Sequence, residues 1–225
     1  MNHSPLPHRR ALLGLLGLGL TLPALQGCFG VAVAGATVGV LAAADRRSLG
    51  VQTDDEAIEL KATSRLSKDI RDRAHVNFTS YNRRVLLTGE VPDEATKARV
   101  ADEVSRIENV QGVWNELVVA GNSSLSSRSN DAYITSKVKA RFIDANQFAA
   151  NHVKVVTEAG TVFLLGIVTE REAQAAVQVA RTTAGVRKVV NVMQIVSDAE
   201  ARRIDASIAN SASSTATSSA PADRR

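Results

Sequence analysis

The sequence predicts an α+β protein that contains two copies of one small domain. The segment HVNFTSYNRRVLLTGEV at 75–91 returns as HVKVVTEAGTVFLLGIV at 152–168. The segment NVQGVWNELVV at 109–119 returns as GVRKVVNVMQIV at 185–196. Because both pairs are displaced by 76 or 77 positions, the repeating unit is a whole domain and not a short motif.

Each copy begins with a helix and continues into two strands. Apolar residues at every fourth place predict the helices, through Ile58, Ala62 and Leu66 in copy one and Ile134, Val138 and Phe142 in copy two. The first strands are predicted at about 75–80 and 153–157, and the nearly continuously apolar second strands at 85–91 and 162–168. Residues that tolerate positive φ lie between the strands and predict tight turns.

A second helix and a third strand complete each copy. The helices are expected after Pro92 and after Thr169, with acidic residues in their first turns, and the third strands at 113–119 and 188–195. The order is therefore α-β-β-α-β. A hairpin pairs the first two strands antiparallel, and a right-handed crossover returns the third strand parallel to the second. This predicts a three-stranded mixed sheet with two helices on one face. A domain of this size has a small core, so we expect the copies to pack together.

The segment before the first copy predicts export and lipidation. Arg9 and Arg10 precede the apolar run ALLGLLGLGLTLPAL, which is too short to span a membrane and typical of a signal peptide. The run leads to LQGC, which ends in Cys28, the one cysteine of the 225-residue chain. LQGC resembles the lipobox of bacterial lipoproteins, in which the thiol is acylated and the preceding peptide is removed. An ordinary signal peptide with an unrelated cysteine is the alternative.

We accordingly expect a lipoprotein signal peptide at 1–27 and a lipidated, membrane-proximal linker at 28–52. Bacterial lipoproteins with Asp after the cysteine tend to stay in the inner membrane. This chain has Phe29 there, which indicates the outer membrane, with the protein facing the periplasm. Without residues 1–27 the formal charge falls from +4 to +2, so the composition gives no indication of nucleic-acid binding.

The repeated motifs resemble the BON domain. The resemblance lies in the strand glycines of VLLTGEV and VFLLGIV and in the two closing segments. LQGC, DRRSLGVQTDD, RLSKD and SNDAYITSKVKARF extend it to a family of outer-membrane lipoproteins with two BON domains, associated with envelope stress and cell division. It implies BON domains at 53–121 and 129–197.

The same resemblance implies a protein that is not an enzyme. Its partner would be an anionic phospholipid membrane of the phosphatidylglycerol or cardiolipin type, bound through the second BON domain. Its function would be to maintain envelope integrity at division sites. The alternative is a protein-binding scaffold for outer-membrane protein assembly, division or cell-wall remodelling.

The residues themselves indicate no catalytic site, metal site or cofactor. His75 and His152 occupy equivalent positions before the first strand of each copy. A metal or general-base role would require clustered partners, and shared ancestry explains the repeated placement. The Ser/Ala-rich segment 198–225 is predicted to be a disordered tail.

A difference between the copies indicates the candidate binding site. Beside the core residues of the first helix, copy two has Tyr133, Lys137 and Arg141 where copy one has Ala57, Lys61 and Arg65. Tyrosine in line with cations is typical of a contact with a membrane interface. The predicted phospholipid-binding residues are Tyr133, Lys137, Arg141, Phe142 and Phe148, the last taken as exposed. Packing of Tyr133 between the two domains is the alternative.

Lipidation can be tested by replacing the thiol. Cys28→Ala should accumulate as an unprocessed precursor, because no acyl acceptor remains, whereas the unaltered chain should begin at an acylated Cys28. Mass spectrometry of the membrane fraction distinguishes the two forms. An unmodified thiol, or a retained segment 1–27, in the unaltered protein would contradict the prediction.

Overall fold

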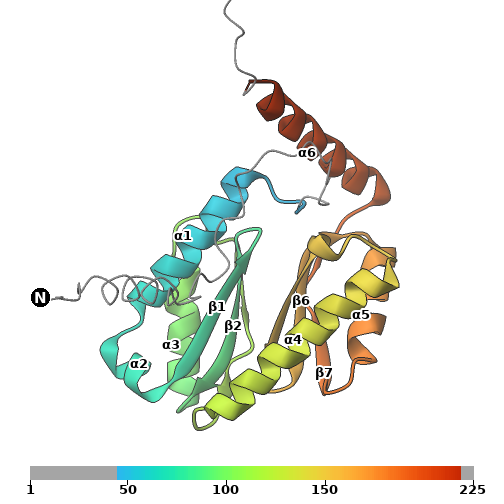
Figure 1. Ribbon diagram of the computed structural model, residues 1–225. Helices are drawn as coiled ribbons and strands as arrows, with labels where there is room; N and C mark the ends of the chain where they lie inside the picture. Colours follow the sequence, from blue (N-terminus) through green and yellow to red (C-terminus); the bar gives the residue numbers. More distant parts are fainter. Residues whose placement is uncertain (1–44, 219–225) are drawn as a thin grey trace, which may run out of the picture. The chain divides into compact units, whose positions relative to one another are not determined.

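The computed structural model describes residues 45–218, with side chains described for 45–210 (Figure 1). All of these belong to one compact unit of the chain. The predicted signal peptide and Cys28 lie outside the described residues. Two successive α-β-β-α-β units follow one another, so the predicted fold class is confirmed.

Both repeats form the predicted elements with one additional short helix each. Repeat one contains α1 (Leu49–Arg65), α2 (Lys68–Arg73), β1 (His75–Tyr81), β2 (Arg84–Val91), α3 (Glu94–Ser105), β3 (Gly112–Asn115) and β4 (Val118–Val119). Repeat two contains α4 (Leu125–Ala145), η1 (Ala150–His152), β5 (Val153–Glu158), β6 (Thr161–Val168), α5 (Glu170–Arg181), β7 (Lys188–Asn191) and β8 (Gln194–Ile195). The helix α6 (Asp198–Ser218) follows.

The predicted third strand of each repeat is interrupted. Asn115 Oδ1 accepts a hydrogen bond from Leu117 N at 3.3 Å, and Asn191 Oδ1 accepts one from Met193 N at 2.9 Å. These side chains replace strand hydrogen bonds over two residues and let Leu117 and Met193 turn into the cores. The strand therefore consists of β3 and β4 in repeat one and of β7 and β8 in repeat two.

The sheets have the predicted mixed topology. β1 and β5 pair antiparallel with β2 and β6, and the interrupted third strands pair parallel with the same central strands. Figure 1 shows α1 and α3 beside the first sheet and α4 and α5 beside the second. The core of repeat one joins Val85, Leu87 and Val91 of β2 to apolar residues of α1 and α3. Repeat two has the corresponding core between β6, α4 and α5.

The sheet faces turned away from the helices meet between the repeats. Leu86 of β2 points away from the helices and belongs to a third buried cluster with Phe163 and Leu165 of β6. The exposed fraction of each of these three side chains is at most 4%. Asn82 Nδ2 also donates to Gln194 Oε1 across the interface at 2.8 Å. The expected packing of the two copies is therefore confirmed, and it occurs sheet against sheet.

Glycines inside β2 and β6 allow close approach of the hairpin strands. A Cβ atom added to Gly89 would lie 2.0 Å from His75 O, and one added to Gly166 would lie 2.4 Å from His152 O. Gly89 also has φ +112°. A side chain at either position would therefore collide with the backbone of the neighbouring strand.

A buried arginine connects the segment before α1 to repeat two. The Arg46 guanidinium contacts Glu172 Oε2 at 2.7 Å, Asp205 Oδ1 at 2.8 Å and the carbonyl of Ile167 at 3.1 Å. Only 6% of Arg46 is exposed. The residue therefore holds the start of the described chain, α5 and α6 together.

The prediction of a disordered tail from 198 is wrong for Asp198–Ser218, which form α6. Ser197 Oγ accepts from Glu200 N at 3.2 Å and begins the helix. Ala201 is buried, and Ile204 packs against the cluster between the sheets. The composition of the tail suggested disorder, but its first turns have apolar contacts and an ion pair with Arg46.

The free energy of unfolding should decrease in mild acid because of the charged groups around Arg46, which include His152 and Asp205. Burial, and then the charge of Arg46, lower the pKa of His152 from its ordinary 6.5. The unfolded chain therefore takes up this proton first, so stability present above pH 6.5 is lost as the pH falls below it. The hydrogen bond from Arg46 lowers the pKa of Asp205, whose contribution is lost at still lower pH.

Thermal unfolding at pH 7.5 and pH 5.5 tests this dependence. The midpoint should fall at the lower pH, and His152→Gln should show a smaller fall because the titrating group is gone. If the thermal midpoint of His152→Gln falls as much as that of the parent between pH 7.5 and pH 5.5, another group is responsible.

Candidate functional site

The helix α4 contains four of the five residues predicted to bind lipid, all except Phe148. Ser124 begins it by accepting a hydrogen bond from Ser127 N at 3.1 Å, and Asn146, with φ 47°, ends it in the left-handed region. The stripe of Ile134, Val138 and Phe142 is at most 1% exposed and faces the core. The opposite side of the helix is thus free to meet another surface.

An acidic side chain in the first helix of each repeat holds the nearby hairpin turn. Asp131 of α4 accepts hydrogen bonds from Ala159 N at 2.9 Å and Gly160 N at 2.8 Å. In repeat one, Asp55 accepts equivalent bonds from the turn between β1 and β2. These contacts fix the orientation of α4 on its sheet, and the sequence analysis did not identify them.

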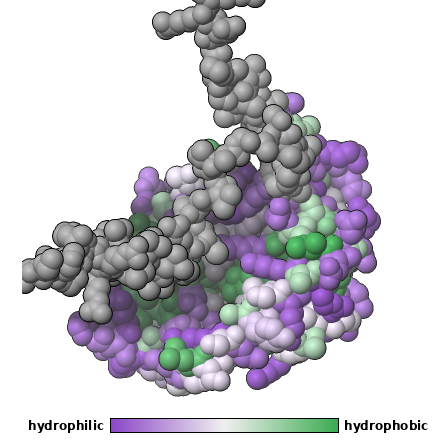
Figure 2. Space-filling model, viewed as in Figure 1, coloured by the Kyte–Doolittle hydropathy of each residue, from purple (hydrophilic) through white to green (hydrophobic). Residues whose placement is uncertain are grey.

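The outer side of α4 has an exposed apolar ridge. Leu125, Tyr133 and Ile143 are 78%, 62% and 68% exposed. Small residues, Ser129, Ala132, Ser136 and Ala140, are exposed between them. Figure 2 shows pale and green surface along the course of α4, with purple regions beside it. Helical spacing from Leu125 to Ile143 could have revealed this ridge, which was not predicted.

The two predicted cations, Lys137 and Arg141, have different contacts near the ridge. Lys137 Nζ lies 4.5 Å from the centroid of the Tyr133 ring and also donates to the carbonyl of Ala184. Arg141 is half-buried and donates to Val179 O at 3.1 Å and Thr183 Oγ1 at 2.9 Å. Arg141 therefore serves first to satisfy the carbonyl group of Val179 in the last turn of α5 and the hydroxyl group of Thr183 after it. The structure thus brings Tyr133 and Lys137 together and places Arg141 deeper.

The two predicted phenylalanines do not belong to the exposed surface. Phe142 is 1% and Phe148 is 9% exposed. Their ring centroids are 5.0 Å apart in an edge-on arrangement within the core of repeat two. The expectation that Phe148 is exposed is wrong, because the chain folds back after Asn146 and seats the ring against Phe142. Phe142 lies in the core stripe, as its spacing predicted, and its buried ring does not reach the surface.

The equivalent helix of repeat one presents a different surface. α1 contains four acidic and two basic residues, whereas α4 contains two acidic and four basic residues. The place of Tyr133 is taken by Ala57, which is half-buried. Lys61 and Glu108 form an exposed ion pair with a 3.5 Å separation. Only the second repeat therefore combines an exposed aromatic ring with a basic helix.

Within residues 45–218, no helix combines the length and apolar character needed to cross a bilayer.

Comparison with known proteins gives a family match and three relatives, one of which is matched over nearly its full length. The family model described as the BON domain matches residues 54–121 and 130–197. The chain is 38% identical to the outer membrane lipoprotein DolP of Haemophilus influenzae, over 86% of this chain and 98% of that protein. It is 35% identical to a 21 kDa hemolysin of Actinobacillus pleuropneumoniae, over 68% and 79% of the two chains. It is 28% identical to the osmotically-inducible protein Y of Escherichia coli, over 61% and 71%.

Proposed function

Because the chain belongs to the family of BON-domain proteins, we propose that it binds anionic phospholipid through the outer side of α4 and thereby maintains the bacterial envelope. The observation that carries this proposal is the exposed ridge of Leu125, Tyr133 and Ile143 next to a lysine that contacts the tyrosine ring. Enzymatic activity is not part of the proposal.

The predicted localisation to the outer membrane is confirmed. The chain is an outer-membrane lipoprotein, like its full-length relative in Haemophilus influenzae. We further propose Cys28 as the acylated residue. Eighteen residues from Cys28 to Arg46 can extend over at most about 60 Å. This tether would keep α4 close to the bilayer and raise its effective concentration there.

The chemistry of the ridge fits an anionic interface better than a second protein. Large exposed apolar side chains of an exported protein indicate a contact surface. Separation of these side chains by serine and alanine gives a narrow, shallow ridge that suits the headgroup region. Lys137 and Lys139 lie beside the ridge, and each cation near an anionic surface contributes about 1 kcal/mol. Localisation to division sites is the most specific part of the proposal, and it rests on the family resemblance alone.

A charge placed on the ridge should abolish this binding. We expect Tyr133→Glu to reduce binding to phosphatidylglycerol vesicles at least tenfold, because it removes the ring and sets a carboxylate against anionic headgroups. Co-sedimentation measures binding by a chain that lacks residues 1–28, so that neither the signal peptide nor the acyl chains dominate. The thermal transition should change little, since Tyr133 is 62% exposed.

Ala57→Glu is the matched control on α1 and should bind vesicles like the parent chain. Binding should also weaken with added salt and be weak on phosphatidylcholine. Normal binding by Tyr133→Glu, or equal damage by Ala57→Glu, would contradict the proposal. A stable protein partner lost in Tyr133→Glu, without vesicle binding by the parent, would favour the scaffold alternative.

A further inference from the structure

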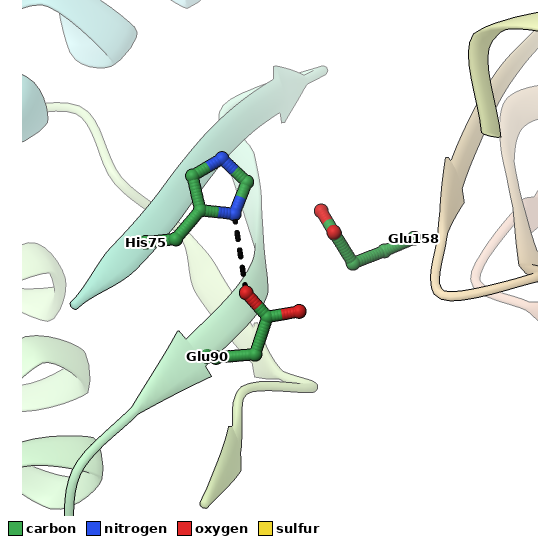
Figure 3. A group of neighbouring side chains, drawn as sticks. All are labelled: His75, Glu90 and Glu158. Carbon is green, nitrogen blue, oxygen red and sulfur yellow. Dashed lines mark ion pairs between the residues drawn. The ribbon is translucent and has the colours of Figure 1, made fainter. Parts of the chain in front are cut away.

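A mixed cluster of metal-ligating side chains lies where the two repeats meet, beside the first turns of α4. His75 opens β1, and Glu90 is its direct partner in the antiparallel register of β2. Glu158 ends β5 of the second repeat. Figure 3 shows His75 and Glu90 on neighbouring strands, with Glu158 reaching toward them from the other side. The cluster therefore joins residues from both repeats.

The positions of the donor atoms suit a small divalent cation. One donor atom from each of His75, Glu90 and Glu158 lies within 4.8 Å of the other two. His75 Nδ1 and Glu90 Oε2 are 3.4 Å apart, which is long for a hydrogen bond. Four tetrahedral bonds of about 2.1 Å place neighbouring ligand atoms about 3.4 Å apart. The observed separation thus matches one edge of a tetrahedral zinc site.

The imidazole nitrogen that faces the carboxylates takes part in no other interaction among the residues that the structure describes. His75 Nδ1 is buried and has no hydrogen-bond partner within the described part of the chain. A neutral imidazole with its lone pair beside a carboxylate oxygen is unfavourable unless a proton or a metal ion lies between them. The side chain of Glu90 is only 8% exposed, so the carboxylate is also withdrawn from water.

Neighbouring groups orient the two carboxylates, and an adjoining cavity gives water or an ion access to them. Asn77 Nδ2 donates to Glu158 Oε2 at 2.9 Å, and Ser123 N donates to Glu90 Oε2 at 3.1 Å. Such contacts are typical of the groups that support metal ligands. A cavity of about 380 Å³ adjoins the cluster and is lined by His75, Asn77, Arg128, Asp131 and Glu158 among others. Arg128, the cation on its wall, donates to the carbonyl of Ser123 at 2.9 Å.

We propose that His75, Glu90 and Glu158 bind one Zn²⁺ ion that connects the two repeats. An imidazole and two carboxylates, without a thiolate, are ligands that Zn²⁺ accepts, and water from the cavity would complete the coordination. The sequence analysis assigned no role to His75 because its partners were not visible. Glu90 is fifteen residues away in the chain, and Glu158 belongs to the other repeat.

The equivalent histidine of repeat two provides the contrast. His152 Nδ1 lies 3.8 Å from Glu172 Oε1, but Arg46 already supplies the positive charge beside that carboxylate. The two histidines thus have the same place in the fold and different neighbours. The zinc assignment applies to His75 alone, which makes His152 a matched control.

Zinc titration of the full lipidated chain in detergent, after removal of metal by a chelator, tests the assignment. Calorimetry should show one Zn²⁺ site per chain that is weakened about tenfold or more by Glu158→Gln and by His75→Gln. His152→Gln should bind like the parent. Saturating Zn²⁺ should raise the thermal midpoint of the parent and of His152→Gln, but not that of Glu158→Gln.

Glu158→Gln preserves the shape of the side chain, so its loss of binding can be separated from misfolding by circular dichroism. Absence of a one-to-one site in the parent would overturn the proposal, as would parent-like binding by His75→Gln or Glu158→Gln. Equal binding of Mg²⁺ and Zn²⁺ would overturn it too, because it would indicate nonspecific attraction to acidic groups. None of these outcomes depends on vesicle binding by α4.

Discussion

Each repeat covers one face of its sheet with helices, and the two uncovered faces contribute the apolar side chains of a cluster that is buried between the repeats. Leu86 on β2 and Phe163 and Leu165 on β6 would lie in water if either repeat stood alone. Burial of one such side chain contributes about 1.5–3 kcal/mol, which is a large share of the stability of a small domain. The two sheets therefore pack against each other, and this contact determines which surfaces remain for function. The helices of both repeats stay on the outside.

The repeat gives one architecture two different outer surfaces. Asp55 and Asp131 hold the hairpin turns in the same way, so α1 and α4 are fixed to their sheets by the same contacts. Their exposed sides differ, because α4 is basic and presents Tyr133 where α1 is acidic and has Ala57. The same divergence separates the two histidines: Arg46 lies beside His152, and two carboxylates lie beside His75. In both cases, function would follow from differences in side chains on an architecture that both repeats share.

Periodicity made most of the fold predictable. The repeat, the core stripe of α4 and the central strands all follow from apolar spacing, since every unit must bury the same sides of the same elements. The interruption at Asn115 was not predictable in this way, because it depends on one side-chain hydrogen bond. The start of α6 depends on a contact between Arg46 and Asp205, which are 159 residues apart. Phe148 was predicted to be exposed near Tyr133, although the fold returns its ring to the core.

The central claim is that sheet packing leaves both α1 and α4 on the outside, and that only α4 has the surface to lie against an anionic bilayer. Nitroxide labels at Ala140→Cys and at the equivalent Ser64→Cys measure this directly, since both positions are exposed. On phosphatidylglycerol vesicles, the label at 140 should gain accessibility to oxygen and lose accessibility to a water-soluble nickel complex, while the label at 64 should stay in water. Equal accessibility changes at the two positions, or a label that inserts only at 64, would contradict the account.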